Sequence, residues 1–233
     1  MAKTKTPLCA KCPSGICNPS IKTGEKFPME KAPGFCPMTN MSGVMQKALL
    51  EYDKPETREF ARKASLQEFE CYENTPQGRR TKNPRILELI EFSKKCGYKK
   101  LGLAFCVGLS EEARALTDLL ESHGFEVISV RCKTGGVPKE KIGIKPEEKI
   151  AGPGSWESMC NPIAQAEILN AAKVDFAVML GLCIGHDTLF IKYCRVPMTV
   201  IAVKDRVTGH NPLAALYTIN SYYRGLAKKT SKP

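Results

Sequence analysis

The spacing of apolar positions changes character near residue 98. From 42 to about 72, apolar residues recur at helical intervals, which predicts two helices, the second with Pro55 near its start. A polar segment, ENTPQGRRTKN, is expected to be a loop, and a third helix is predicted between Pro84 and Gly97. The first hundred residues therefore contain helices but no predicted sheet.

Beyond residue 98, short apolar runs alternate with helical segments. The predicted strands are 99–107, 125–132, VDFAVMLGL and PMTVIAVK, and the predicted helices are SEEARALTDLLESHG, WESMCNPIAQAEILNAAK, HDTLFIKYC and PLAALYTINSYYRGL. Ser110 is expected to be the N-cap of the first of these helices, and Gly124 to end it. This alternation predicts an α/β fold: a Rossmann-like three-layer domain with a four-stranded parallel sheet in the order 2-1-3-4. Its ligand crevice would lie between the first and third strands.

Three parts are predicted along the chain. Residues 1–40 are rich in Cys, Pro and Gly and lack a sustained apolar period, so we expect a metal-binding segment that needs a staple to become ordered. Residues 41–98 form a helical segment packed on the main domain, and 99–233 form the α/β domain with a second cysteine site.

The composition indicates the cellular compartment and, with it, the role of the cysteines. Residues of apolar type make up 42% of the chain, and no run of eighteen apolar residues appears, so neither disorder nor a membrane span is expected. The N-terminus lacks the apolar core of a secretory signal, and we expect a cytoplasmic protein. In that reducing compartment, 11 cysteines indicate metal or redox chemistry rather than disulfides.

The formal net charge of +11 suggests an anionic partner. The charge is spread along the chain apart from RRTKNPR, no aromatic residues alternate with that run, and there is one Trp, so nucleic acid is not the expected partner. A solvated surface explains most of the charge. The same surface would suit an acidic electron-donor protein.

The N-terminal cysteines have the spacing of a metal site. Cys9, Cys12, Cys17 and Cys36 give C-x2-C-x4-C-x18-C, with Pro after Cys12 and after Cys36. Closely spaced cysteines with a distal fourth ligand and a Cys-Pro ending favour an iron–sulfur cluster, expected to be [4Fe-4S]. Zinc is the alternative at this site, because spacing alone separates the two poorly.

A second set of cysteines falls at predicted strand ends. Cys106, Cys132 and Cys183 end the first three strands, and Cys160 lies near the start of the helix before the third. Since parallel strands open their carboxyl ends on one edge, these four thiols are expected to hold a second cofactor, another iron–sulfur cluster. The alternative is that each is a small buried residue. The other three, Cys71, Cys96 and Cys194, are expected to serve packing.

Polar residues gather at the same predicted edge. His186 follows Cys183 directly, and Lys204 and His210 follow the fourth strand. As loop residues at a ligand edge, they are candidate catalytic groups, either proton donors or anion clamps for a small-molecule substrate. The glycine-rich tract after Cys132 would allow a mobile cover.

The motifs MCNPIAQAEILN, GLCIGHD and VKDRVTGHNP resemble those of a family of unknown function, described as cysteine-rich, metal-binding proteins of anaerobic bacteria and archaea. The resemblance covers nearly the whole chain and implies metal binding by both cysteine sets, but it supplies no reaction. In architecture alone, the design is similar to carbon monoxide dehydrogenase and hybrid-cluster proteins.

These observations predict an iron–sulfur protein in which the N-terminal cluster passes electrons to the one at the sheet edge. Whether it is a reductase is left open. Two alternatives remain: a zinc-stabilised scaffold or nucleic-acid-binding module, and a metal or sulfur carrier without turnover.

Overall fold

The computed structural model describes residues 6–19, 22 and 25–226. The chain divides into two compact units, Met1–Phe69 and Glu70–Pro233. In the first unit, the cysteine-rich part forms short turns and the predicted helices follow. Its elements are two 3-10 turns, Cys9–Lys11 and Met29–Lys31, and helices α1 (Pro37–Asn40), α2 (Ser42–Glu51) and α3 (Pro55–Glu70).

The segment predicted to be a polar loop is instead a β-hairpin, so that prediction is wrong. Strands β1 (Tyr72–Thr75) and β2 (Gly78–Thr81) pair antiparallel. Glu73 lies opposite Arg80 and forms an ion pair with it, and the Arg79 guanidinium lies 5.4 Å from the centre of the Tyr72 ring. Cross-strand pairs of this kind stabilise the hairpin without an apolar face.

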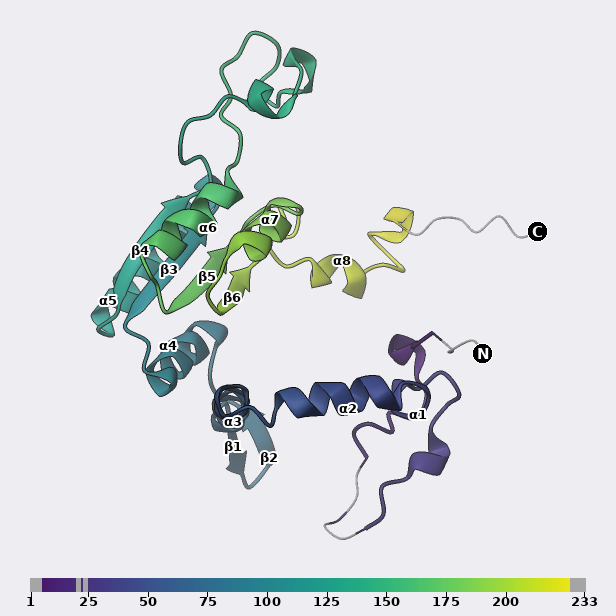
Figure 1. The fold of residues 1–233 in the computed structure, drawn as a ribbon. Coiled ribbons are helices and arrows are strands. Elements are labelled where there is room, and N and C mark those ends of the chain that lie inside the picture. The colour runs from purple at the N-terminus through teal and green to yellow at the C-terminus, as the bar shows by residue number, and fades with distance from the viewer. Residues whose placement is uncertain (1–5, 20–21, 23–24, 227–233) are drawn as a thin grey trace, which may run out of the picture. The chain divides into compact units, whose positions relative to one another are not determined.

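The second unit is built on a four-stranded parallel sheet, shown in Figure 1. The strands lie in the order β4-β3-β5-β6, which is the predicted order 2-1-3-4. Their bounds are β3 (Lys100–Phe105), β4 (Glu126–Arg131), β5 (Phe176–Leu180) and β6 (Met198–Ala202). All carboxyl ends therefore lie at one edge, and the order reverses between β3 and β5.

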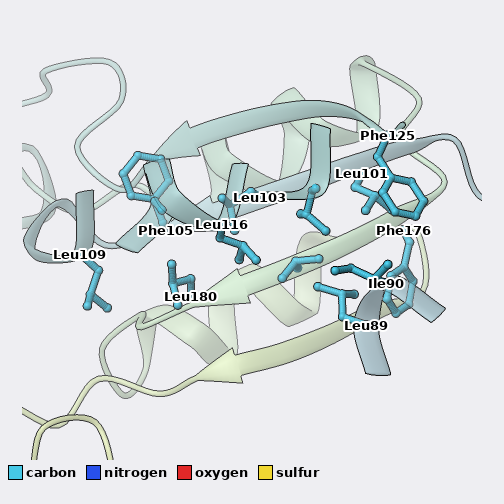
Figure 2. Close-up of a cluster of buried hydrophobic side chains, with 13 residues drawn as sticks. Leu89, Ile90, Leu101, Leu103, Phe105, Leu109, Leu116, Phe125, Phe176 and Leu180 are labelled. Carbon is cyan, nitrogen blue, oxygen red and sulfur yellow. The ribbon is translucent and has the colours of Figure 1, made fainter. Parts of the chain in front are cut away.

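Each face of the sheet carries its own apolar core. One core joins the sheet to α4 (Arg85–Cys96) and α5 (Ser110–Ser122), and its side chains are shown in Figure 2. The other joins the sheet to α6 (Pro162–Ala171) and α7 (His186–Tyr193). Continuous apolar runs in the central strands are thus explained by burial on both sides.

Helix ends differ from the predictions in three places. Ser110 is the first residue of α5 rather than its N-cap, and its hydroxyl donates to the Val107 carbonyl over 2.7 Å. Helix α6 begins at Pro162, capped by the Asn161 side chain, because the residue before a proline is disfavoured in helical geometry. The last predicted helix is short, with α8 covering only Leu213–Tyr217.

Within the part of the chain that the structure describes, no helix has the length and apolarity needed to span a bilayer.

Candidate functional site at the carboxyl edge of the sheet

Three cysteines meet at the carboxyl edge of the sheet, and we call them the thiol group: Cys106, Cys132 and Cys160. Cys106 follows β3 and Cys132 follows β4, while Cys160 lies in the segment before α6. The Cys132 and Cys160 sulfur atoms are 4.0 Å apart, and Cys132 also hydrogen-bonds with Cys106. Thiols from three separate segments therefore share one site.

Backbone pairing explains how these segments reach one another. The Cys132 N–H donates to the Phe105 carbonyl over 2.9 Å, which continues the β3–β4 ladder past the last strand residue. The Asn161 N–H donates to the Cys132 carbonyl over 2.7 Å and brings Cys160 to the same place. The sheet therefore sets the spacing of the thiols.

The pKa values of the three thiols are shifted in different directions. Hydrogen bonds with Cys132 lower the pKa of Cys106 and of Cys160. The same two contacts, together with burial, raise the pKa of Cys132. A lowered pKa raises the thiolate fraction of a cysteine, and the thiolate is the form that acts as nucleophile and as metal ligand.

Cys183, the fourth predicted ligand, lies apart from the thiol group in its contacts. Its sulfur accepts a hydrogen bond of 3.1 Å from Arg206, which comes from the loop after β6. Gly181 and Gly185 flank it with φ values of 68° and 84°, so the chain turns sharply between β5 and α7. The convergence is thus closest at the ends of β3 and β4, beside the predicted crevice between β3 and β5.

Positive side chains approach the thiols. Lys204 contacts Cys106 and helps to lower its pKa, after Cys132 and the Gly108 N–H. Lys133 and His186 act in the same direction on the pKa of Cys160. The His186 Nδ1 atom is buried and has no hydrogen-bond partner among the described residues.

His210, the remaining catalytic candidate, has a local structural role. Its Nδ1 accepts a hydrogen bond of 3.0 Å from the Asp205 N–H, and its own N–H donates to the Asp205 carbonyl over 2.9 Å. Its φ of 67° places it in the left-handed region. These contacts shape the loop that carries Lys204 and Arg206.

Gln165 was not singled out from the sequence, yet its side chain holds the backbone that carries Cys106 and Cys132. It is fully buried on α6, and its Nε2 donates to the Phe105 carbonyl over 3.1 Å and to the Val130 carbonyl over 2.7 Å. Phe105 directly precedes Cys106, and Val130 lies two residues before Cys132. The amide therefore ties α6 to both strand ends.

We expect Gln165→Leu to lower the free energy of unfolding by about 2 kcal/mol, since two buried hydrogen bonds to backbone carbonyls are lost, at about 1 kcal/mol each. Urea titration monitored by circular dichroism would measure the change. A variant as stable as the parent would show that the two hydrogen bonds contribute nothing net.

The four predicted N-terminal ligands lie within the described residues and form no disulfide, and no described hydrogen bond joins their side chains. Cys9 and Cys17 are exposed, Cys36 is buried, and the Cys12 sulfur lies 3.5 Å from the Ser14 hydroxyl, which lowers the Cys12 pKa. Across residues 6–19, 22 and 25–226, no group of three or more His, Cys, Asp or Glu side chains is arranged to hold a metal ion. The four-thiolate site stays a prediction.

The remaining cysteines lie away from the thiol group. Cys71 is buried, and Cys96 is partly buried at the end of α4. The half-buried Cys194 has its sulfur 3.6 Å from the Val196 carbonyl. The thiol group and the parallel sheet together define an open α/β protein with a cysteine-lined carboxyl edge.

Comparison with known proteins assigns the sequence of this chain to a family. The chain matches the family described as "Protein of unknown function (DUF1847)" over residues 36–201, and it belongs to that family. It is also 44% identical to the uncharacterized protein MJ0455 of Methanocaldococcus jannaschii over 180 residues, which is 77% of this chain and 86% of the relative. No solved structure gives a significant match. The expected membership in a family of unknown function is confirmed, while metal binding stays a prediction.

Proposed function

We propose that this chain binds a metal centre through cysteine thiolates at the carboxyl edge of the sheet. Cys106, Cys132 and Cys160 would be its ligands, with Cys183 as a fourth released from Arg206. The observation that carries the proposal is the meeting of three thiols from three segments in one place. Packing alone does not require such a meeting, because buried cysteines need no sulfur partners.

The chemistry of the donors fits a metal centre. Thiolates are soft ligands that suit zinc and iron–sulfur clusters, and two of the three thiols have lowered pKa values. Val107 donates its N–H to the Cys132 sulfur over 3.3 Å, the kind of contact that tunes a metal-bound thiolate. The donor types therefore fit the group that the sequence predicts, but the thiols would have to rearrange to bind one ion together, since no described group of three is placed to hold one.

An iron–sulfur centre is the form we favour. The N-terminal cysteines, with their closely spaced pattern and Cys-Pro endings, would hold a second centre of the same kind. Bound at the two sites, such clusters would supply electron transfer. Reduction of a small molecule at the sheet edge, with electrons from an acidic donor protein, is the activity that would follow.

Zinc is a second candidate, and the distance between the Cys132 and Cys160 sulfur atoms favours it. Sulfur ligands of a tetrahedral zinc ion lie about 3.8 Å from one another, as follows from a zinc–sulfur bond of about 2.3 Å. The Cys132 and Cys160 sulfur atoms are 4.0 Å apart. A structural zinc site, or a metal carrier without turnover, would use the same ligands.

Metal analysis of protein purified without oxygen tests these forms against one another. The two-cluster form predicts brown protein with iron and acid-labile sulfide well above the content of one cubane, about four irons per chain. A content near four supports one cluster, and colourless protein with stoichiometric zinc supports the second candidate. Full-length protein that retains neither metal after reconstitution would overturn the proposal.

We expect the metal-free chain to form a Cys132–Cys160 disulfide when treated with diamide, which takes two electrons and two protons from a pair of thiols. The sulfur atoms need only close from 4.0 Å to bonding distance. Peptide mapping without reduction would locate the bond, with Cys194 as the unlinked reference. Metal loading should block the reaction, and cross-linking that ignores metal would contradict shared ligation.

A further inference from the structure

The side chains around the thiol group and Cys183 are predominantly cationic. The Lys204 ammonium lies beside Gly108, 3.5 Å from the position that a Cβ would take there, and lowers the pKa of Cys106; Arg206 donates to the Cys183 sulfur from the same loop. Lys133 follows Cys132 in the chain, and its ammonium donates to the Ser158 carbonyl, two residues before Cys160, whose pKa it lowers. Three cations from two separate segments therefore face one edge of the sheet.

The neighbouring carboxylates keep their negative charge, but no described hydrogen bond or ion pair joins them to the thiols or to the three cations. Asp187 accepts a hydrogen bond of 2.7 Å from the Thr188 N–H at the start of α7. Asp205 accepts from the Val207 and Thr208 N–H groups over 2.9 and 3.1 Å. Their charge is directed toward backbone donors.

Backbone groups add further positive potential. The Val107 N–H donates to the Cys132 sulfur over 3.3 Å, and the Gly108 N–H hydrogen-bonds to Cys106. The turn at Val107–Leu109 thus directs donors toward the thiols. Such turns form concavities that favour anions.

The bound centre would not neutralise the three cations. A divalent metal ion with four thiolates carries a net charge of two minus, and with three thiolates one minus. Lys133, Lys204 and Arg206 together carry three positive charges at neutral pH. Against these three cations alone, at least one positive charge is left over in either case, and an anionic ligand placed among them would balance it.

We propose that the carboxyl-edge site takes a small anionic ligand, such as a carboxylate or oxyanion, and that Lys204 and Arg206 select for its negative charge. This inference rests on the proposed function only in using the same site. It names the class of molecule that would meet the thiols or their metal centre. Arg206 is exposed and Lys204 is partly buried, so both are placed to receive a ligand from solvent.

The test compares two alkylating agents of nearly equal size on the reduced, metal-free chain. Iodoacetate is an anion and iodoacetamide is neutral, so the ratio of their rates cancels the reactivity of the thiol itself. Mass spectrometry would give this ratio separately for Cys106 and Cys160. We expect the iodoacetate rate divided by the iodoacetamide rate to be about fivefold higher than for the same cysteines in the denatured chain. This factor is the effect of one nearby positive charge in water.

Three variants make the result specific. Lys204→Gln and Arg206→Gln should each lower the ratio by about twofold, so that together they remove most of the preference. Lys99→Gln removes the same charge at the amino end of β3, the opposite edge of the sheet, and should leave the ratio unchanged. Because Arg206 is exposed, its variant is expected to fold even if Lys204→Gln does not.

A ratio equal to that of the denatured chain would overturn the inference, as would an equal loss in Lys99→Gln and Arg206→Gln. The measurement needs no metal, so it fails or succeeds independently of the proposed function. A chain that takes no metal but prefers iodoacetate would disprove the metal proposal and keep the anion site. A chain that takes up metal but does not prefer iodoacetate would keep the metal proposal and disprove the anion site.

Discussion

Cys132→Ser is expected to abolish metal retention at the carboxyl edge of the sheet. Cys132 is the central member of the thiol group, buried and hydrogen-bonded to both neighbours, so its loss leaves Cys106 and Cys160 without a shared partner. Removing a support of a metal ligand already costs about 10- to 100-fold in affinity, and removing a ligand should cost at least the upper value. Metal content after anaerobic reconstitution and desalting would report the loss.

The matched control is Cys194→Ser, which makes the same change at a half-buried thiol whose contact is the Val196 carbonyl. It should retain the full metal content. A further variant, Cys9→Ser with Cys12→Ser, should affect only the N-terminal site. Equal metal content in the Cys132 and Cys194 variants would remove the thiol group from the proposal.

Gly181→Ala should be the most destabilising of the small substitutions near the site. With φ at 68°, alanine there is strained, and its Cβ would lie 1.9 Å from the Leu109 Cδ1 atom. Leu109 is 3% exposed and belongs to the core shown in Figure 2, so it cannot move away freely. Strain and overpacking together should cost about 2–4 kcal/mol.

The variant Gly185→Ala separates the cost of backbone strain from the cost of overpacking. Gly185 also has a positive φ, 84°, but no atom lies within 4 Å of the position its Cβ would take. This variant should lose only about 1 kcal/mol, the strain alone. Urea unfolding midpoints of both variants would give the comparison. If the two lose the same stability, close packing of Leu109 against Gly181 has no energetic consequence.

The sheet was predictable because its signal is local and repeated. Short apolar runs alternating with helical segments allow few topologies, and the strand order followed from them. The hairpin was not predictable in this way. Strand β2 is exposed along its whole length, so no alternation of apolar and polar residues marks it. Its stability depends on pairs such as Glu73 with Arg80, which only the register reveals.

The candidate site was predictable in place but not in detail. Topology brings strand ends to one edge, and Cys106, Cys132 and Cys160 do lie together there. The contact between Cys183 and Arg206 depends on a left-handed glycine turn and on the direction of a long side chain. Gln165 gave no signal, because a single glutamine in an apolar helix carries no pattern.

The thiol group also bears on the order in which this protein is made. Its members arrive from β3, β4 and the segment before α6, so they are distant neighbours until the crossovers between these elements have closed. A nascent chain that has emerged only as far as β4 would lack Cys160 and could not capture a centre. If this edge binds a metal as proposed, insertion has to follow the synthesis of Cys160 and the pairing of its segment with Cys132.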